Sequence, residues 1–382
     1  MSFSFFKPSR PKTPQELAKA IRDSFIALDT KTVAEVKALE KAMEEVEKNI
    51  MTMKIMLSGD GEVEPNADQV LQLAVEVCNE DVIALFIHKL PILGWEARKN
   101  LVQCWSILLK QKVDDSLFCC VQYMENHFEL LDFLVVCYDN KEIALHCGSM
   151  LRECIKVPSL AKYILESPSF ELFFKFVELP NFDISSDAFS TFKDLLTKHA
   201  SEVSDFLMAH YNEFFQQYET LLTSKNYVTR RQSLKLLSDF LLEAPNSHIM
   251  KRYITEVHHL KVMMTLLKLS WTVHNSKKLT CFCLSNIHYC LGKKNGDAAI
   301  EAPEDSSKNI QISAFHIFKV FVANPNKPRE IKLILSKNHE KLLELLHDLS
   351  GGKGGDDEQF EEEKEMIIKE IERLSRQLPN LE

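Results

Sequence analysis

A helix with one apolar face is predicted at residues 226–244, where hydrophobic and polar positions alternate with a helical period. The apolar positions follow the i, i+3, i+6, i+7 spacing of a single stripe: Leu234, Leu237, Phe240 and Leu241. The basic residues Arg230, Arg231 and Lys235 lie off this stripe. We therefore expect the apolar stripe to pack inward and the basic residues to remain accessible to a partner.

Weaker copies of the same pattern recur at residues 103–110, 144–155, 186–196 and 312–322. In each copy a small or short residue precedes the core pair, which gives five aligned positions: Cys104, Gly148, Ala188, Ser233 and Ala314. Successive gaps between these positions are 44, 40, 45 and 81 residues. Periods near 40 to 47 are typical of HEAT and armadillo units, which contain two or three helices each.

The last gap returns to 45 residues when the 36 residues 269–304 are removed. This stretch has a weak period, three clustered cysteines and an end rich in Gly, Lys and Asn. We interpret it as an insertion into the helical array, of splice-variant or gene-model origin, and expect it to form a partly disordered loop.

The N-terminal residues 1–12 are expected to form an extended arm, since Pro8 and Pro11 oppose helix formation. The first helix is then expected to start with Thr13 as its N-cap and Pro14 at its first position. Glu16 lies three residues after Thr13, which is the spacing of a capping box.

A second, longer helix is predicted by apolar residues that step alternately by three and four: Val36, Leu39, Met43, Val46, Ile50, Met53 and Leu57. This stripe allows either a self-associating coiled coil or packing against the next repeat. We favour packing, because three heptads are close to the minimum for a coiled coil.

The C-terminal residues 351–382 begin with the flexible linker Gly351 to Gly355 and continue with an acidic stretch. An amphipathic helix is predicted at the end, with one apolar face: Ile367, Ile371, Leu374 and Leu378. That face either docks on the end of the array or binds a separate partner.

The predicted fold is therefore all-α, an armadillo- or HEAT-like solenoid in which helix pairs or triplets form a right-handed superhelix. The repeats are expected to make one scaffold domain at residues 13–350, interrupted at 269–304. Few glycines and prolines for the length of the chain, 10 and 13, favour helices over a sandwich or barrel.

The formal net charge of −9 argues against nucleic acid as the main ligand, because phosphate binding needs a basic surface. No stretch has the ~18 apolar residues of a membrane span, and the first residues lack the apolar core of a signal peptide. The ten cysteines are then expected to be reduced in a cytoplasmic protein.

Catalytic signatures are missing from the sequence, including the nucleophile elbow, the phosphate loop and the kinase motifs. Within the predicted insertion a zinc site is conceivable, from Cys281, Cys283, His288 and Cys290, with His274 as a further candidate. Their spacing matches none of the usual ligand patterns. We expect no catalytic residues, no metal, no cofactor and no small-molecule substrate.

A helical solenoid without catalytic residues most often presents a groove to another protein. The second half of the chain supplies basic and apolar candidates for such a groove: Arg230, Arg231, Lys235, Met263, Met264, His316, Lys319 and Lys337. For each cation a merely solvated helix face is an equally good interpretation, and methionines are more often core than pocket.

Five segments closely resemble the mouse protein 25 family, also called calcium-binding protein 39. The sequence as a whole is similar to that of a plant-type member. The five are M-L-R-E-C-I at 150–155, the segments at 187–199, 226–237 and 314–327, and D-E-Q-F-x-x-E-K at 357–364. The resemblance covers nearly the whole chain apart from the predicted insertion. Despite the second name, it implies no calcium chemistry.

The resemblance implies a non-catalytic helical-repeat scaffold that binds sterile-20-type protein kinases or a related pseudokinase and holds the kinase domain in its active conformation. It also implies a pocket for a short Trp-Glu-Phe motif at the pseudokinase C-terminus. By position, that pocket maps to Arg231, Lys235, Met264 and Lys337. A passive structural adaptor for cytoskeletal or cell-polarity proteins is the alternative function.

Two features of the chain depart from the family pattern. Animal members use an arginine and a phenylalanine after the central repeat helix to contact a tumour-suppressor kinase, whereas this chain has Glu243 to Ser247 there. We do not predict that complex. The predicted insertion begins five residues after Met264, so it is also expected to affect the pocket.

Overall fold

The computed structural model of the protein describes residues 10–29, 36–62, 64–114, 117–274, 304–349 and 357–377. These residues form twenty α-helices and four short 3-10 helices, and their only β feature is an isolated bridge between Lys112 and Phe118. The predicted all-α helical-repeat solenoid is thereby confirmed. No helix within these ranges has the length and hydropathy of a membrane-spanning segment.

The chain divides into two compact units, and the division falls inside α12 (Ala200–Ala209). The helices of unit 1, residues 1–206, are α1 (Pro14–Asp29), α2 (Val36–Ser58), α3 (Ala67–Asn79), α4 (Val82–Lys89), α5 (Trp95–Leu108), α6 (Cys119–Asn126), α7 (Glu129–Val136), α8 (Ala144–Ile155), α9 (Pro158–Glu166), α10 (Leu172–Phe176), α11 (Phe182–Thr197) and the first part of α12.

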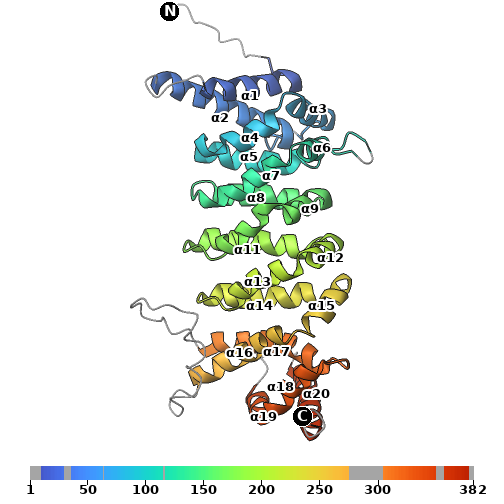
Figure 1. Ribbon diagram of the computed structural model, residues 1–382. Helices are drawn as coiled ribbons and strands as arrows, with labels where there is room; N and C mark the ends of the chain where they lie inside the picture. The colour runs from blue at the N-terminus through green and yellow to red at the C-terminus, as the bar shows by residue number, and fades with distance from the viewer. Residues whose placement is uncertain are drawn as a thin grey trace, which may run out of the picture. The chain divides into compact units, whose positions relative to one another are not determined.

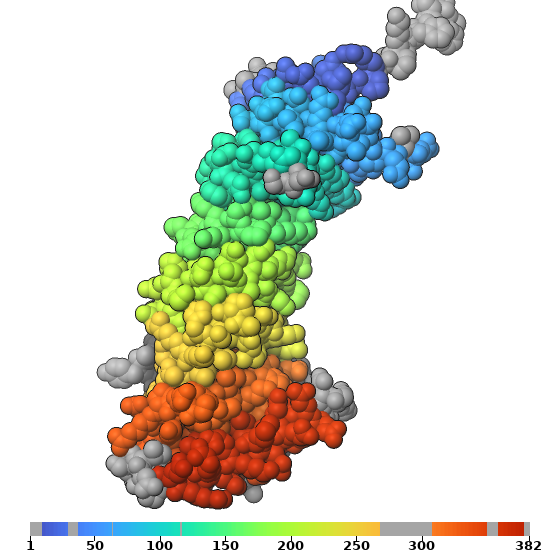
Figure 2. Space-filling view, turned by 90° about the vertical axis from the view of Figure 1, so that its right-hand side faces the viewer, coloured from blue at the N-terminus to red at the C-terminus, as the bar shows by residue number. Residues whose placement is uncertain are grey.

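Unit 1 is built from repeats of three helices, and α3 to α5, α6 to α8 and α9 to α11 are successive repeats (Figure 1). Helices at equivalent places stack on one another: α3, α6 and α9 in one row, α4 and α7 in a second, and α2, α5, α8 and α11 in a third. The repeats of this unit follow one another as coloured bands from blue to green in the space-filling view (Figure 2). The structure thus shows three helices per repeat.

Unit 2, residues 207–382, contains the end of α12 and the helices α13 (Tyr211–Leu222), α14 (Tyr227–Leu241), α15 (Ser247–Tyr253), α16 (Val257–His274), α17 (Glu304–Ala323), α18 (Arg329–Lys337), α19 (His339–Asp348) and α20 (Asp357–Arg376). Here α15 to α17 and α18 to α20 are three-helix repeats. Their third helices again form a row, in which α17 contacts both α14 and α20.

The five aligned small residues all lie on third helices: α5, α8, α11, α14 and α17. All five are buried. A small side chain lets neighbouring helix backbones approach closely, so the period seen in the sequence marks the side of each third helix that faces the protein interior. The apolar stripe predicted on 226–244 is confirmed in the same way, since its four residues are at most 1% exposed.

The predicted capping box at the start of α1 is confirmed. The Thr13 N–H donates to Glu16 Oε2 at 2.9 Å, and the Glu16 N–H donates to Thr13 Oγ1 at 3.3 Å. These hydrogen bonds satisfy backbone donors that have no partner within the helix. The hydrogen bond from the Thr13 backbone lowers the pKa of Glu16 below its ordinary value.

The stripe of α2 packs inside unit 1, as we favoured over a coiled coil. Val46, Ile50, Met53 and Leu57 are buried, and α2 contacts both α1 and α5. A half-buried polar tie accompanies this packing, because Lys54 Nζ donates to Asn100 Oδ1 of α5 at 2.9 Å.

A polar network joins α8 to α11 at the level of Gly148. Arg152 of α8 pairs with Asp187 of α11 at 2.8 Å. The Tyr138 hydroxyl donates to Asp187 Oδ2 at 2.8 Å and lies 2.8 Å from Thr191 Oγ1. A Cβ atom on Gly148 would lie 1.9 Å from Asp187 Oδ2 and 2.4 Å from the Tyr138 hydroxyl. The network therefore occupies the space that any larger residue at 148 would need.

The C-terminal helix α20 docks on its neighbours through its apolar face. Ile367, Ile371 and Leu374 are at most 5% exposed, and α20 contacts α17, α18 and α19. Two lysines secure it: Lys319 pairs with Glu363 at 2.5 Å, and Lys327 pairs with Glu370 at 2.8 Å. Docking is thus confirmed for these three positions, while Leu378 lies outside the described residues.

Several predictions from the sequence fall on residues that the structure does not describe. Most of the arm at 1–12 and the linker at 351–355 lie outside the described residues, as do Cys281, Cys283, His288 and Cys290. Of the predicted insertion, the backbone of 269–274 continues α16, α17 begins at Glu304, and 275–303 lie outside the described residues.

Gly148→Ala is expected to lower the free energy of unfolding by about 2 kcal/mol, because the added methyl overpacks the α8–α11 contact. The sign of this change distinguishes a crowded position from a tolerant one, because alanine at a tolerant helical position stabilises the protein by about 1 kcal/mol relative to glycine. Denaturant unfolding would measure the change. Leu145→Ala, at a position of the same helix that is 44% exposed, is the control and should change little. A stabilised Gly148→Ala protein would contradict this account.

Glu370→Gln is expected to lower the free energy of unfolding by about 2 kcal/mol at pH 7, less than the loss of a fully buried ion pair. Hydrogen bonds from Arg373 and Lys327 lower the pKa of Glu370 from 4.5 to about 2. A carboxylate with a lowered folded-state pKa stabilises the protein above its unfolded pKa, and this contribution disappears as pH falls through the folded value. The difference between variant and parent should therefore shrink between pH 4.5 and pH 2.

Thermal unfolding across this pH range would test the prediction. The control is Glu365→Gln on the same helix, because Glu365 pairs with Lys369 where both side chains are 69% exposed. Equal effects of the two substitutions would show that the Lys327 contact does not hold α20.

Candidate functional site

The structure of α14 explains how its basic residues are presented. Asn226 caps the helix, with its side-chain oxygen accepting hydrogen bonds from the backbone N–H of Val228 at 2.9 Å and of Thr229 at 3.5 Å. On the buried side of α14, the Tyr218 hydroxyl of α13 donates to the Ser233 carbonyl at 2.7 Å. With its apolar side buried, the other side of α14 is left facing outward.

That outward side carries a stripe of two cations between two apolar residues. Arg231 and Lys235 are exposed and lie one helical turn apart. Val228, three residues before Arg231, is 37% exposed, and Leu242, seven residues after Lys235, is 46% exposed. Among the described residues, neither cation has an ion-pair partner. We call Val228, Arg231, Lys235 and Leu242 the α14 stripe.

The other two predicted site residues lie on different helices of unit 2. Met264 of α16 is 7% exposed, and Lys337 is an exposed residue in the last turn of α18. Helix α17 contacts both α14 and α16, and α16 contacts α18. The four residues thus belong to one connected set of helices, but only Arg231 and Lys235 share a helix face.

Several other groove candidates have structural roles. Arg230 is half-buried, and its guanidinium donates to the Ser224 carbonyl at 2.7 Å. Lys319 is engaged with Glu363 of α20, and Met263 is fully buried. His316 is half-buried, and burial lowers its pKa. Met263 therefore belongs to the core, whereas Arg230 and Lys319 are engaged in contacts within unit 2 and do not lie on a merely solvated helix face.

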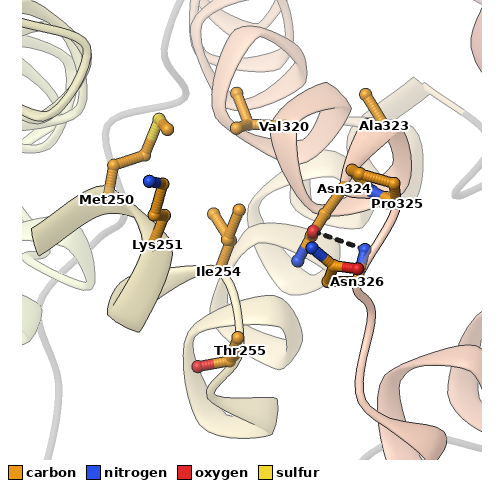
Figure 3. A pocket seen from close by; sticks show the side chains of 9 residues that line it. All are labelled: Met250, Lys251, Ile254, Thr255, Val320, Ala323, Asn324, Pro325 and Asn326. Atoms are coloured by element: carbon orange, nitrogen blue, oxygen red, sulfur yellow. Dashed lines mark hydrogen bonds between the residues drawn. The ribbon is translucent and has the colours of Figure 1, made fainter. Parts of the chain in front are cut away.

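A cavity of about 430 Å³ lies in unit 2, between the end of α15 with the residues that follow it and the end of α17 (Figure 3). One side carries Met250, Lys251 and Ile254, and the other carries Val320 and the turn from Ala323 to Asn326. The Asn326 N–H donates to Asn324 Oδ1 at 2.9 Å, which shapes this turn. Because the lining is mainly apolar, the cavity can accept an apolar side chain, and it offers no acid–base pair.

A smaller cavity of about 230 Å³ is lined by titratable residues, including Glu219, Glu256, His258 and His259. Burial, followed by the charges of His258 and Arg252, lowers the pKa of His259 to about 4. The His259 ring also stacks on Tyr253 with ring centroids 3.9 Å apart. At neutral pH His259 is therefore an uncharged, packed ring, and the lining contains no serine, threonine or cysteine nucleophile.

The geometry of the α14 stripe is suited to contact with an acidic partner. The α14 stripe can attract a carboxylate through two uncompensated cations, which stand out in a chain of net charge −9. Its flanking apolar residues can contact hydrophobic side chains of the same partner. Together with the repeats, this defines the class of protein as a helical-repeat protein with an exposed cationic and apolar surface.

The chain belongs to the Mo25-like family, whose model matches residues 4–274 and 287–375. It is 40% identical to the calcium-binding protein 39-like protein of Mus musculus over 369 residues, which cover 96% of this chain and 97% of that protein. It is 38% identical to a putative MO25-like protein of Arabidopsis thaliana over 371 residues, which cover 96% of each chain.

A MO25-like protein of Caenorhabditis elegans is 39% identical over 364 residues, covering 95% of this chain and 96% of that one. The family resemblance inferred from the five sequence segments is thereby confirmed. The family model leaves residues 275–286 unmatched, and these lie inside the segment 269–304 that we interpret as an insertion.

Two parts of the surface described here were not found from the sequence. Val228 and Leu242 could have been found, because they lie at helical spacing from Arg231 and Lys235 on the side opposite the core stripe. The cavity beside Met250 had no comparable signal, since its two sides are about 70 residues apart in the chain.

Substitutions at the predicted site residues should differ in their effects on the free energy of unfolding. Arg231→Ala and Lys235→Ala are expected to change the free energy of unfolding by less than about 0.5 kcal/mol, because both are exposed. Met264→Ala is expected to cost about 3 kcal/mol, because it leaves a cavity in the core. Denaturant unfolding of the three variants would test this, and a strongly destabilised Arg231→Ala protein would contradict the assignment of Arg231 to a free surface.

Proposed function

We propose that the protein is a non-catalytic scaffold that binds a sterile-20-type protein kinase, or a related pseudokinase, and stabilises the active conformation of the kinase domain. Membership of the Mo25-like family supports the scaffold role. The observation that carries the proposal is the α14 stripe, whose cations are exposed and uncompensated among the described residues. The kinase as partner follows from the resemblance described above.

The α14 stripe suits a peptide that ends in Trp-Glu-Phe. Arg231 and Lys235 would pair with the glutamate and the terminal carboxylate, because hydrogen bonds between charged groups are about twice as strong as neutral ones. Val228 would contact an aromatic ring of the motif. Leu242, 14 residues further along the helix and so about 21 Å away, would contact another part of the same partner. Lys337 adds a third cation on α18, and Met264 acts from the core by supporting the helices beside the stripe.

Activation would follow from unequal affinity for two kinase conformations. A scaffold that binds the active state more tightly shifts the kinase population toward that state, and one that binds both equally shifts nothing. A tenfold shift requires a difference in binding free energy of about 1.4 kcal/mol. This requirement separates an activator from the alternative, a passive adaptor that binds without changing the kinase rate.

The charge-reversed variant Arg231→Glu/Lys235→Glu is expected to weaken binding of a Trp-Glu-Phe peptide at least tenfold, because attraction becomes repulsion at both positions. Fluorescence titration would measure the dissociation constant. The matched control is Lys141→Glu/Lys162→Glu, which makes the same charge change at exposed lysines of unit 1 and should leave affinity unchanged. Equal weakening of peptide binding in both variants would show that only the net charge of the protein matters. The α14 stripe would then not be the binding site.

The same proteins would then be added to a sterile-20-type kinase domain and its phosphorylation rate measured. We expect the parent and the unit 1 control to raise the rate, and the α14 variant to raise it less. Binding without a rate change would favour the passive adaptor. Absence of both binding and activation for the parent chain would overturn the proposed partner.

A further inference from the structure

Three cysteine thiols that play no part in the proposed function meet in unit 1. Cys78 lies near the end of α3, and Cys119 and Cys120 are the first two residues of α6. The sulfur atoms of Cys78 and Cys120 are 3.5 Å apart, and those of Cys119 and Cys120 are 4.0 Å apart. All three sulfur atoms lie within 4.8 Å of one another. Cys120 is buried, whereas Cys78 and Cys119 are half-buried and reachable from solvent.

The elements that carry the cysteine cluster are tied together by packing and hydrogen bonds. Helices α3 and α6 pack against each other, and the Tyr123 hydroxyl of α6 donates to Asp81 Oδ1, just after α3, at 3.1 Å. Ahead of α6, the Val113 N–H donates to the Leu117 carbonyl at 2.8 Å, beside the isolated bridge that leads into Cys119. Ligands fixed on packed elements in this way need little rearrangement when a metal binds.

We propose that Cys78, Cys119 and Cys120 form a binding site for the soft monovalent cation Cu(I), coordinated by three thiolates. Three ligands arranged trigonally at about 2.3 Å from a metal are about 4 Å from one another. The observed separations of 3.5 and 4.0 Å agree with this geometry. Thiolates are soft ligands that select Cu(I) over harder cations such as Mg²⁺ and Ca²⁺.

The number of ligands favours Cu(I) over Zn²⁺. Structural zinc sites are almost always four-coordinate, and no fourth histidine, cysteine, aspartate or glutamate of the described residues joins the cluster. On binding, three copper–sulfur bonds form and three thiol protons pass to solvent, with no change in oxidation state. The N-terminal end of α6 adds a favourable positive field for the thiolates of Cys119 and Cys120.

The test uses the full chain, reduced and free of oxygen, titrated with Cu(I) held by a chromophoric competitor. We expect it to bind one more Cu(I) than the variant Cys78→Ser/Cys119→Ser, which keeps the buried Cys120 and changes only half-buried positions. The control is Cys281→Ser/Cys283→Ser/Cys290→Ser, which removes the other group of three cysteines and should retain this Cu(I). X-ray absorption should show three sulfur atoms at about 2.3 Å from copper.

Thermal unfolding supplies a second readout, because a ligand that binds only the folded state raises its stability. Cu(I) should raise the unfolding temperature of the parent and of the control, but not that of the Cys78→Ser/Cys119→Ser protein. Equal copper uptake by the parent and this variant would overturn the proposal, as would loss of the Cu(I) in the control. Preferential binding of Zn²⁺ by the parent would overturn the choice of Cu(I).

Discussion

Within each unit, close packing between the third helices of successive repeats is the contact on which the rest of the structure depends. It requires small or compact residues on the buried side of these helices, as at Gly148, where the space for a Cβ atom is already filled by Asp187 and Tyr138. Polar ties add direction to this packing. Trp105 of α5 donates its indole N–H to the Met150 carbonyl of α8 at 3.1 Å, and Arg152 of α8 pairs with Asp187 of α11. The repeats that end in α5, α8 and α11 are thereby set in register with one another.

This packing also determines which side chains are available for binding. A third helix that buries one side against its neighbours leaves the opposite side exposed, and on α14 that side carries the α14 stripe. Elsewhere in unit 2, cations are used to hold the structure together: Lys319 and Lys327 fasten α20, and Arg230 closes the turn before α14. Which cations stay exposed and which are structural thus follows from where each helix is covered.

The candidate site was predicted in part from the sequence. The exposure of Arg231 and Lys235 follows from their positions off the apolar stripe, which is a property of a single helix. The structural role of Lys319 could not be predicted in this way, because its partner Glu363 is 44 residues further along and reaches it only after α20 has docked. The cysteine cluster escaped prediction for the same reason, since Cys78 and Cys120 are 42 residues apart.

The sequence by itself determined the repeat period, the apolar stripe of each third helix and the capping box at Thr13. The stripe and the capping box depend on helical periodicity and on hydrogen bonds between residues three apart, so neighbouring residues suffice to specify them, and the repeat period follows from the recurrence of the stripe. Only the tertiary structure decided that each repeat has three helices, that α2 packs on α5 and that α20 docks on α17, α18 and α19. Such contacts join residues on separate helices, and they form only when whole helices bury their faces against one another.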